Sequence, residues 1–426
     1  MRKRIFFLSL FGILGLCLLA GIAYNLPPIH ERLAWRVDNL RVGIRRYLNP
    51  PEEAVFIPQE QVDAIVDATL TAMAPTSTPT LPAGPTGTPL PSATPTLIPT
   101  PIPESITLNG IRHEYQKFNN CAPASLSMVL SYWGWEGDQI GARAYLRPNF
   151  EVDDKNVNAF EIVDFVETQT DLDAVWRVGG DLQLLKRLLA AGFPVLIEKG
   201  LEPHVKDWMG HYQVISGYND AKGKFLVYDS YEGPPEAYGI TYESMQFWRH
   251  FNFVYVVIFP PERAAEVQSI LGSNSDPLIN FQLAAELALQ ETSTLNGREQ
   301  FFAWFNRGTN LVYLQDYAGA AQAYDTAFAT YATLSEEERP WRMLWYQDGP
   351  YAAYYYTGRY QDVISLAKTT LSSVDKPVLE ETYYWRGMAK AALGDKEGAL
   401  EDLNRALALN PKSTPAGDAL QRLNSQ

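Results

Sequence analysis

The first hydrophobic feature of the chain is an uncharged run that follows a basic start, Met1 to Arg4. Residues 5–26 carry no charged side chain, and a helix needs about 20 such residues to cross a bilayer. The pattern therefore predicts a transmembrane anchor over 1–27. A cleaved signal peptide, with Gly21-Ile22-Ala23 as the processing site, is the alternative, although its apolar core would normally be only about 7–15 residues long.

A juxtamembrane segment and a polar linker follow the anchor. Over 28–73 the apolar positions fit a short amphipathic helix within 51–73, at Val62, Ile65, Val66 and Leu70. Residues 74–104 contain ten prolines among Thr, Ser and Ala, a composition that favours extended polyproline II. At about 3.1 Å per residue the linker could reach roughly 90 Å. We expect a stalk that suits an extracytoplasmic setting, with a cytosolic interdomain linker as the alternative.

Residues 105–262 mix two periodicities. Helical spacing occurs at 122–132, 160–167 and 182–191, and Asp181 and Gly192 suit the caps of the last helix. Short strand-like runs follow, at 194–197, 212–216, 225–228 and 253–259. Helices followed by strands indicate an α+β domain.

Residues 280–426 have a helical pattern throughout and contain an internal repeat. Small and aromatic residues recur with the same spacings in two sets: Trp304, Gly308, Ala320, Tyr324 and Ala327, then Tyr383, Gly387, Ala399, Leu403 and Ala406. A weaker copy lies between them, from Gly358 to Ala367. The pattern resembles the tetratricopeptide repeat, a helix–turn–helix unit that stacks into a solenoid. We expect about three repeats over 300–412 and a protein partner on them.

Composition narrows the chemistry. The 49 acidic and 35 basic side chains give a net charge of −14, which argues against a nucleic-acid binder. Two cysteines exclude a disulfide scaffold and a Cys₄ zinc site, and no sequence motif indicates a cofactor. Cys17 lies in the apolar run, so Cys121 is the only cysteine left for chemistry in the soluble part.

The sequence around Cys121 favours a reactive thiol. Asn119 and Asn120 can cap a helix that begins near Cys121, and the positive end of a helix dipole lowers a thiol pKa. Gln116 lies five residues upstream, where its amide and the Cys121 backbone N–H could form an oxyanion hole.

A thiolate nucleophile needs a base and a group that orients it. His211 opens one predicted strand and Asp229 ends the next, with turn residues 219–223 between them. A hairpin centred near Ala221 places Asp229 opposite Gln213, on the same face as His211, whereas a one-residue slip would separate them. We expect structural or peripheral roles for His113, His204 and His250, and we expect Trp208 at the rim of the cleft.

These motifs resemble those of a known family. Gln116, then Asn120 to Leu126, is similar to the nucleophile motif of the bacteriocin-processing, double-glycine-leader peptidases and their stand-alone relatives. Gly210-His211-Tyr212 and Tyr228-Asp229-Ser230 resemble their base and third-residue motifs. The resemblance implies a papain-like fold with Cys121 as nucleophile, His211 as base, Asp229 as orienting residue and Gln116 as oxyanion donor. The family usually has Gly where this chain has Ala122.

The expected protein is therefore a membrane-anchored cysteine peptidase with an α+β papain-like domain and an all-α, tetratricopeptide-like solenoid. Its substrate would be a peptide or protein. Two alternatives stay open. Ala122 is compatible with a weakly active or inactive peptide-binding module, and the same three residues could serve an acyltransferase or amidase.

Overall fold

The computed structural model describes residues 55–59, 102–148, 156–202, 208–236, 238–373 and 378–425, and the single residues 15, 21, 22, 24, 26, 37, 40 and 44. Within these residues no helix is both long and apolar enough to cross a membrane. Most of the predicted anchor and most of the Pro-rich linker fall outside the described residues, and both stay predictions.

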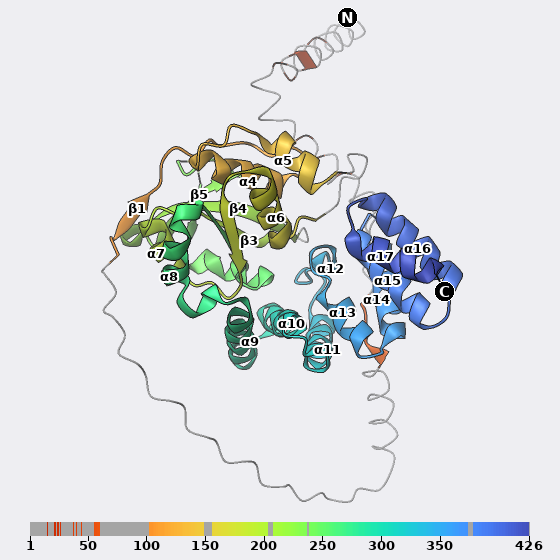
Figure 1. The fold of residues 1–426 in the computed structure, drawn as a ribbon. Helices are drawn as coiled ribbons and strands as arrows, with labels where there is room; N and C mark the ends of the chain where they lie inside the picture. Colours follow the sequence, from red (N-terminus) through yellow and green to blue (C-terminus); the bar gives the residue numbers. More distant parts are fainter. Residues whose placement is uncertain are drawn as a thin grey trace, which may run out of the picture.

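An antiparallel sheet forms the centre of the α+β domain (Figure 1). Its strands are β1 (Ser105–Thr107), β2 (Asp173–Arg177), β3 (Val195–Leu201), β4 (Met209–Asn219), β5 (Lys224–Asp229), β6 (Gly239–Thr241) and β7 (Tyr255–Phe259). They lie in the order β2-β7-β3-β4-β5-β6, and β1 pairs with β4. The predicted runs at 194–197, 212–216, 225–228 and 253–259 correspond to β3, β4, β5 and β7.

Both faces of the sheet are covered. On one face lie α4 (Cys121–Tyr132), α5 (Gln139–Leu146) and α6 (Ala159–Gln169), and on the other lie α7 (Leu182–Ala190) and α8 (Ala264–Leu271). Alternate residues of a strand point to opposite faces. Leu196 of β3 accordingly packs in the core on the α4 side, and Val195 and Ile197 pack on the α7 side. Because both faces are covered, β3 is buried along its whole length, including the charged residues Glu198 and Lys199.

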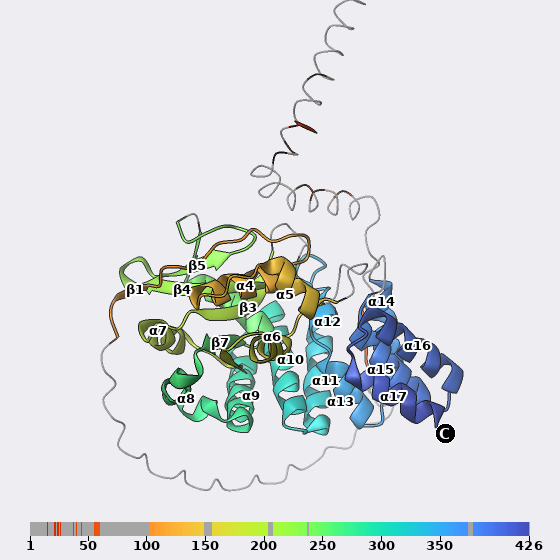
Figure 2. The same cartoon turned by 45° about the horizontal axis from the view of Figure 1, so that its top comes forward.

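The helical region continues directly from this domain. Its helices are α9 (Pro277–Thr294), α10 (Gly297–Tyr313), α11 (Tyr317–Thr333), α12 (Met343–Tyr346), α13 (Gly349–Tyr356), α14 (Tyr360–Ser372), α15 (Glu380–Ala392), α16 (Lys396–Leu409) and α17 (Thr414–Asn424). Figure 2 shows them following one another from below the sheet to the C-terminus. The pairs α10–α11, α13–α14 and α15–α16 match the three predicted repeats, and the extra residues between the first two pairs contain α12.

Small residues make the helix crossings close, as their spacing predicts. A Cβ on Gly308 would lie 2.8 Å from the Tyr324 ring, and one on Gly387 would lie 3.1 Å from Leu403. A larger residue at Gly308 would force the Tyr324 ring to move, and one at Gly387 would require a smaller shift of its neighbours. The two outer repeats therefore use equivalent glycines for equivalent contacts.

The helical region and the α+β domain share one hydrophobic core. Trp208 is buried at their junction, stacked on Phe251 with ring centroids 5.7 Å apart and in edge contact with Tyr346 of α12. The expectation that Trp208 forms the rim of the cleft is therefore wrong, because helices that the sequence places after the domain cover it. Asn252 and Asn310 add a reciprocal pair of amide hydrogen bonds across the same junction.

A short segment before the linker also packs on the helical region. Phe56 is 7% exposed, with its ring centroid 5.1 Å from that of Phe328, and the Gln59 backbone N–H donates to Asp362 at 2.9 Å. Residues 55–58 have no regular secondary structure, so within the described residues the helix predicted over 51–73 begins no earlier than Gln59. The chain thus contacts the folded body before the linker as well as after it.

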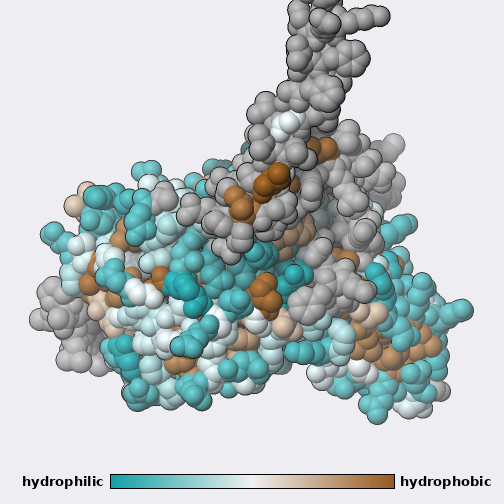
Figure 3. Space-filling model, turned by 90° about the horizontal axis from the view of Figure 1, so that it is seen from above, coloured by the Kyte–Doolittle hydropathy of each residue, from teal (hydrophilic) through white to brown (hydrophobic). Residues whose placement is uncertain are grey.

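The surface of the described residues seen from above is predominantly hydrophilic, with small groups of hydrophobic side chains among them (Figure 3).

Candidate active site

Cys121 is the first residue of α4, as the sequence predicts. The helix is held in place by a run of buried residues from Ala122 to Leu130, and Ser125 Oγ donates to the Tyr212 carbonyl at 2.9 Å. Asn120 is the N-cap, but its side chain donates to Gln139 at 2.9 Å and makes no capping hydrogen bond. The amide therefore anchors the loop before α4 to α5, and the thiol lies at the positive end of the helix dipole.

The predicted register between β4 and β5 is confirmed. Gln213 lies opposite Asp229, and His211 Nε2 donates to Asp229 Oδ1 at 2.9 Å. The register depends on an irregularity: Asn219 pairs with Lys224 near the turn, but a bulge between Ile215 and Gly217 shifts the pairing by one residue. Without that shift Asp229 would lie opposite Val214 and point to the other face.

Asp229 is a buried acceptor with several donors. Besides His211, it accepts hydrogen bonds from the Gln213 side chain and from the backbone N–H groups of Tyr231 and Glu232, the last two at 2.6 and 2.9 Å. Burial alone would raise the pKa of Asp229, but the His211 charge and these donors lower it to about 2. The carboxylate is therefore ionised and fixes the orientation of the imidazole.

The thiol and imidazole stabilise each other's charged forms. Burial opposes ionisation of Cys121, but the hydrogen bond and charge of His211, with the Tyr212 backbone N–H, lower its pKa below the ordinary value. Burial also disfavours the charged imidazole, yet Asp229 and the Cys121 thiolate raise the pKa of His211. Because Nε2 is bonded to Asp229, Nδ1 is the nitrogen available to the thiol.

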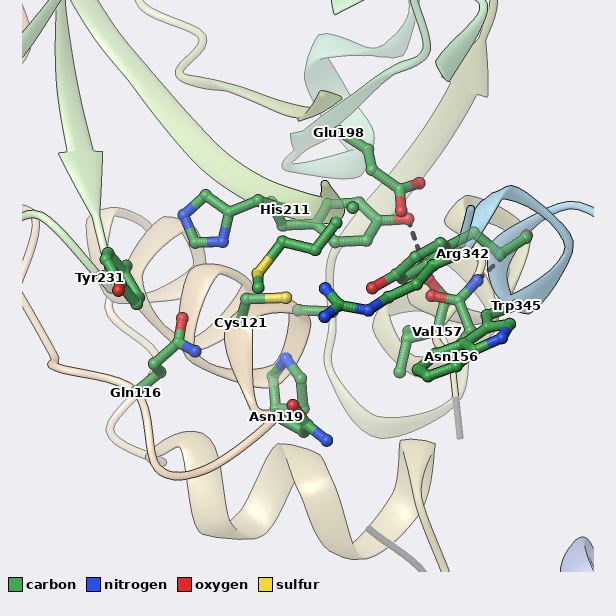
Figure 4. A pocket seen from close by; sticks show the side chains of 16 residues that line it. Gln116, Asn119, Cys121, Asn156, Val157, Glu198, His211, Tyr231, Arg342 and Trp345 are labelled. Carbon is green, nitrogen blue, oxygen red and sulfur yellow. Dashed lines mark hydrogen bonds between the residues drawn. The ribbon is translucent and has the colours of Figure 1, made fainter. Parts of the chain in front are cut away.

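Gln116 lies beside the thiol. Its Oε1 accepts a hydrogen bond from Ser230 Oγ at 2.8 Å, and its backbone N–H donates to the Ser230 carbonyl at 2.9 Å. The Gln116 side chain points toward Cys121 in Figure 4, and with its oxygen bonded to Ser230 the amide N–H group remains to donate in the pocket. Two further side chains support the site: Ser230, which directly follows Asp229, and Gln213, which lies two residues after His211. The sequence analysis did not assign these supporting roles.

One pocket brings together three of the four predicted site residues, Gln116, Cys121 and His211. Its lining comprises Gln116, Asn119, Cys121, Ala122, Pro123, Asn156, Val157, Glu198, Met209, Gly210, His211, Tyr212, Tyr231, Arg342, Trp345 and Tyr346. Asp229 lies directly behind His211. The last three lining residues belong to α12 and the residue before it, so the helical region contributes one wall (Figure 4). Sequence reasoning missed this wall because its residues lie more than 100 positions from the motifs.

The remaining histidines lie away from the thiol or outside the described residues. His113 Nε2 donates to the Asp229 backbone carbonyl at 2.8 Å, and so supports the end of β5. His250 is buried between Trp208 and Glu299, and His204 lies outside the described residues. Among the residues that the structure describes, no cluster of three or more His, Cys, Asp or Glu side chains could hold a metal ion.

Two segments of the chain match known protein families. Residues 108–256 match the Peptidase_C39 like family, and residues 380–413 match the Tetratricopeptide repeat. A solved structure described as a C39-like peptidase, from Bacillus anthracis, is 17% identical, with a TM-score of 0.31, over 37% of this chain and 98% of that chain. No curated protein matches the chain significantly. Residues 108–256 thus form a domain of the peptidase C39-like family, and the helical region after it carries a tetratricopeptide repeat.

Proposed function

We propose that the chain is a cysteine peptidase that hydrolyses peptide bonds, with Cys121 as nucleophile. The observation that carries the proposal is the contact of the Cys121 thiol, at the start of α4, with His211, whose other ring nitrogen is bonded to buried Asp229. Covalent acyl transfer requires a thiol that is activated by a neighbouring base. Cys121 has such a base, and it lies in a pocket that several elements line.

In the proposed reaction the Cys121 thiolate attacks the carbonyl carbon of the scissile bond. The oxyanion that forms is held by the Gln116 amide N–H and the Cys121 backbone N–H. The His211 imidazolium protonates the leaving amine, which departs and leaves a thioester on Cys121. A water molecule, deprotonated by His211, then attacks the thioester and restores the free thiol.

The setting is also part of the proposal. The uncharged run at 5–26 and the Pro-rich residues 74–104 support a single-pass membrane anchor with both domains extracytoplasmic. The tetratricopeptide repeat supports a protein partner on the helical region.

Peptide hydrolysis by the purified chain tests the function. We expect cleavage of a mixed peptide library by the wild type and none by Cys121→Ala, with Ser131→Ala, at the far end of the same helix, as a matched control that keeps activity. Adding a primary amine separates hydrolysis from acyl transfer, because a transferase would form an amide product. Full cleavage by Cys121→Ala would refute the mechanism.

One observation favours the peptide-binding alternative. Ala122 lines the pocket directly after the nucleophile, where the related peptidases usually have Gly. Its methyl group narrows the space for a substrate backbone. An inert thiol in a chain that still binds peptides would support this alternative.

A further inference from the structure

The helical region holds the start of β4, the strand that carries His211. Arg342, the residue before α12, donates from Nη1 to the Trp208 carbonyl at 3.0 Å. At the other end of α12, Asn156 Nδ2 of the α+β domain donates to the Tyr346 carbonyl at 3.3 Å. Both ends of this short helix are therefore fixed to the α+β domain beside the pocket.

The Tyr346 ring packs directly on the main chain next to His211. Gly210 precedes His211 in β4, and it has no side chain that could separate its backbone from the ring. A Cβ on Gly210 would lie 3.0 Å from two carbon atoms of the Tyr346 ring and 2.6 Å from the Phe251 ring. The ring of Tyr346 therefore contacts the backbone one residue before the imidazole.

Two buried rings hold Tyr346 in place. Trp208 and Phe251 stack on each other, with ring centroids 5.7 Å apart. The Tyr346 ring meets both of them edge-on, with centroids 5.8 Å from Trp208 and 5.7 Å from Phe251. Edge-to-face contacts of this kind favour one orientation of the ring. Tyr346 is thus a fixed support for the first residues of β4.

The imidazole of His211 has partners in two other elements. Its Nε2 is bonded to Asp229 of β5 at 2.9 Å, and it is also hydrogen-bonded to the Cys121 thiol at the start of α4. A shift of the start of β4 would change the distance of the imidazole from both partners. Since a displacement of about 1 Å can disable a reacting pair, the support of β4 matters to the chemistry.

We propose that Tyr346 is a positioning residue for the Cys121–His211 pair, because its ring fixes the backbone of β4 from which His211 extends. The inference rests on the proposed function only in treating this pair as the reacting one. It gives a role to the residues inserted between the first two repeats, since α12 completes the active site of the α+β domain. Residues 108–256 alone would lack this support.

The pH dependence of Cys121 alkylation tests the inference without requiring turnover. In Tyr346→Ala the midpoint of the alkylation profile should rise by about one pH unit, since a neighbouring opposite charge shifts a pKa by about 1–3. Tyr346→Phe keeps the ring and should titrate as the wild type does. Tyr346→Leu should give a smaller rise, and it serves if Tyr346→Ala does not fold. An unmoved midpoint in the folded Ala or Leu variant, or an equal rise in Tyr346→Phe, would overturn the inference.

Tyr355→Ala is the matched control. Like Tyr346, Tyr355 is a half-buried tyrosine of the helical region. Its ring contacts lie within the repeats, on Tyr356, Tyr360 and Trp385. Its midpoint should equal that of the wild type, and a rise as large as that of Tyr346→Ala would overturn the inference. A raised midpoint in Tyr346→Ala without hydrolysis by the wild type would refute the proposed function alone, and hydrolysis with an unmoved midpoint would refute this inference alone.

Discussion

At the scale of residues, the site depends on groups that orient the reacting ones. Ser230 holds the Gln116 oxygen, and Gln213 joins His211 and two backbone N–H groups as donors to Asp229. Asp229 thus orients His211, and Gln213 and Ser230 orient Asp229 and Gln116. The sequence contained the signal for these supports, since both lie within two residues of a predicted site residue, but only a known register shows which face they occupy.

Gln116 and Ser230 should act as a unit. Removing an oxyanion donor typically costs about 10²–10³ in kcat, so Gln116→Ala should lose that factor while its thiol is still alkylated at the wild-type rate. Ser230→Ala should lose about 2- to 10-fold, because only the orientation of the amide is affected. Steady-state kinetics of the double variant should match Gln116→Ala. Multiplied losses would show that Ser230 acts by another route.

At the scale of elements, the β4 bulge decides whether the site assembles. The alternation of apolar residues was enough to predict the strands and the turn, and a hairpin centred near Ala221 predicted that Gln213 pairs with Asp229. It could not predict that the turn itself sets a register one residue away, nor that a bulge at Ser216 corrects it. Bulges depend on which residue the local backbone leaves unpaired, and no hydrophobic pattern records this. The pocket wall formed by α12 could not be predicted either, because its position depends on tertiary packing.

The 3-10 helix η2 (Glu243–Phe251) links the two regions through His250. Trp208 Nε1 donates to His250 Nδ1 at 3.0 Å, so Nδ1 carries no proton, and Nε2 therefore donates to Glu299 at 3.1 Å. The ring also stacks on Phe302, with centroids 3.7 Å apart. Burial lowers the pKa of His250 to about 4 from 6.5, so the folded chain holds this histidine neutral.

The free energy of unfolding should therefore fall in acid, because His250 becomes protonated in the unfolded chain but stays neutral in the folded chain. Above about pH 6.5 His250 is neutral in both states and does not affect this free energy. As the pH falls towards 4, the free energy of unfolding decreases by about 3 kcal/mol at most. His250→Phe keeps the stacking but removes the titration, so its deficit in urea midpoint relative to wild type should shrink between pH 7 and pH 4.5. A deficit that is constant with pH would contradict a neutral His250.

At the scale of the whole molecule, the residues before the linker are part of the folded body. Phe56 lines a groove together with Trp341 and Met343, the neighbours of Arg342. The segment 340–346 therefore faces the catalytic pocket on one side and the groove on the other. We expect docking of residues 55–59 to support the pocket wall, a role that a stalk predicted from composition alone did not suggest.

Phe56→Ala should release this docking. Replacing a buried phenylalanine by alanine costs about 3–5 kcal/mol. A short segment that loses this much should no longer stay bound to the helical region. Hydrogen exchange should rise over 340–346 and over the facing part of α14, whereas Ile57→Ala, whose side chain is 47% exposed, should leave both unchanged. Equal protection in Phe56→Ala and wild type would show that the segment does not support the wall.

The central claim is that Cys121 and His211 form a thiolate–imidazolium pair, and the pH dependence of alkylation tests it most directly. The chain has only two cysteines, so mass spectrometry can assign the modification to Cys121. Because His211 lowers the pKa of the thiol, the alkylation rate of the wild type should titrate at a lower pH than that of an ordinary cysteine. His211→Ala should move the transition to higher pH. A wild-type thiol that titrates near pH 8.5, unchanged in His211→Ala, would contradict the account.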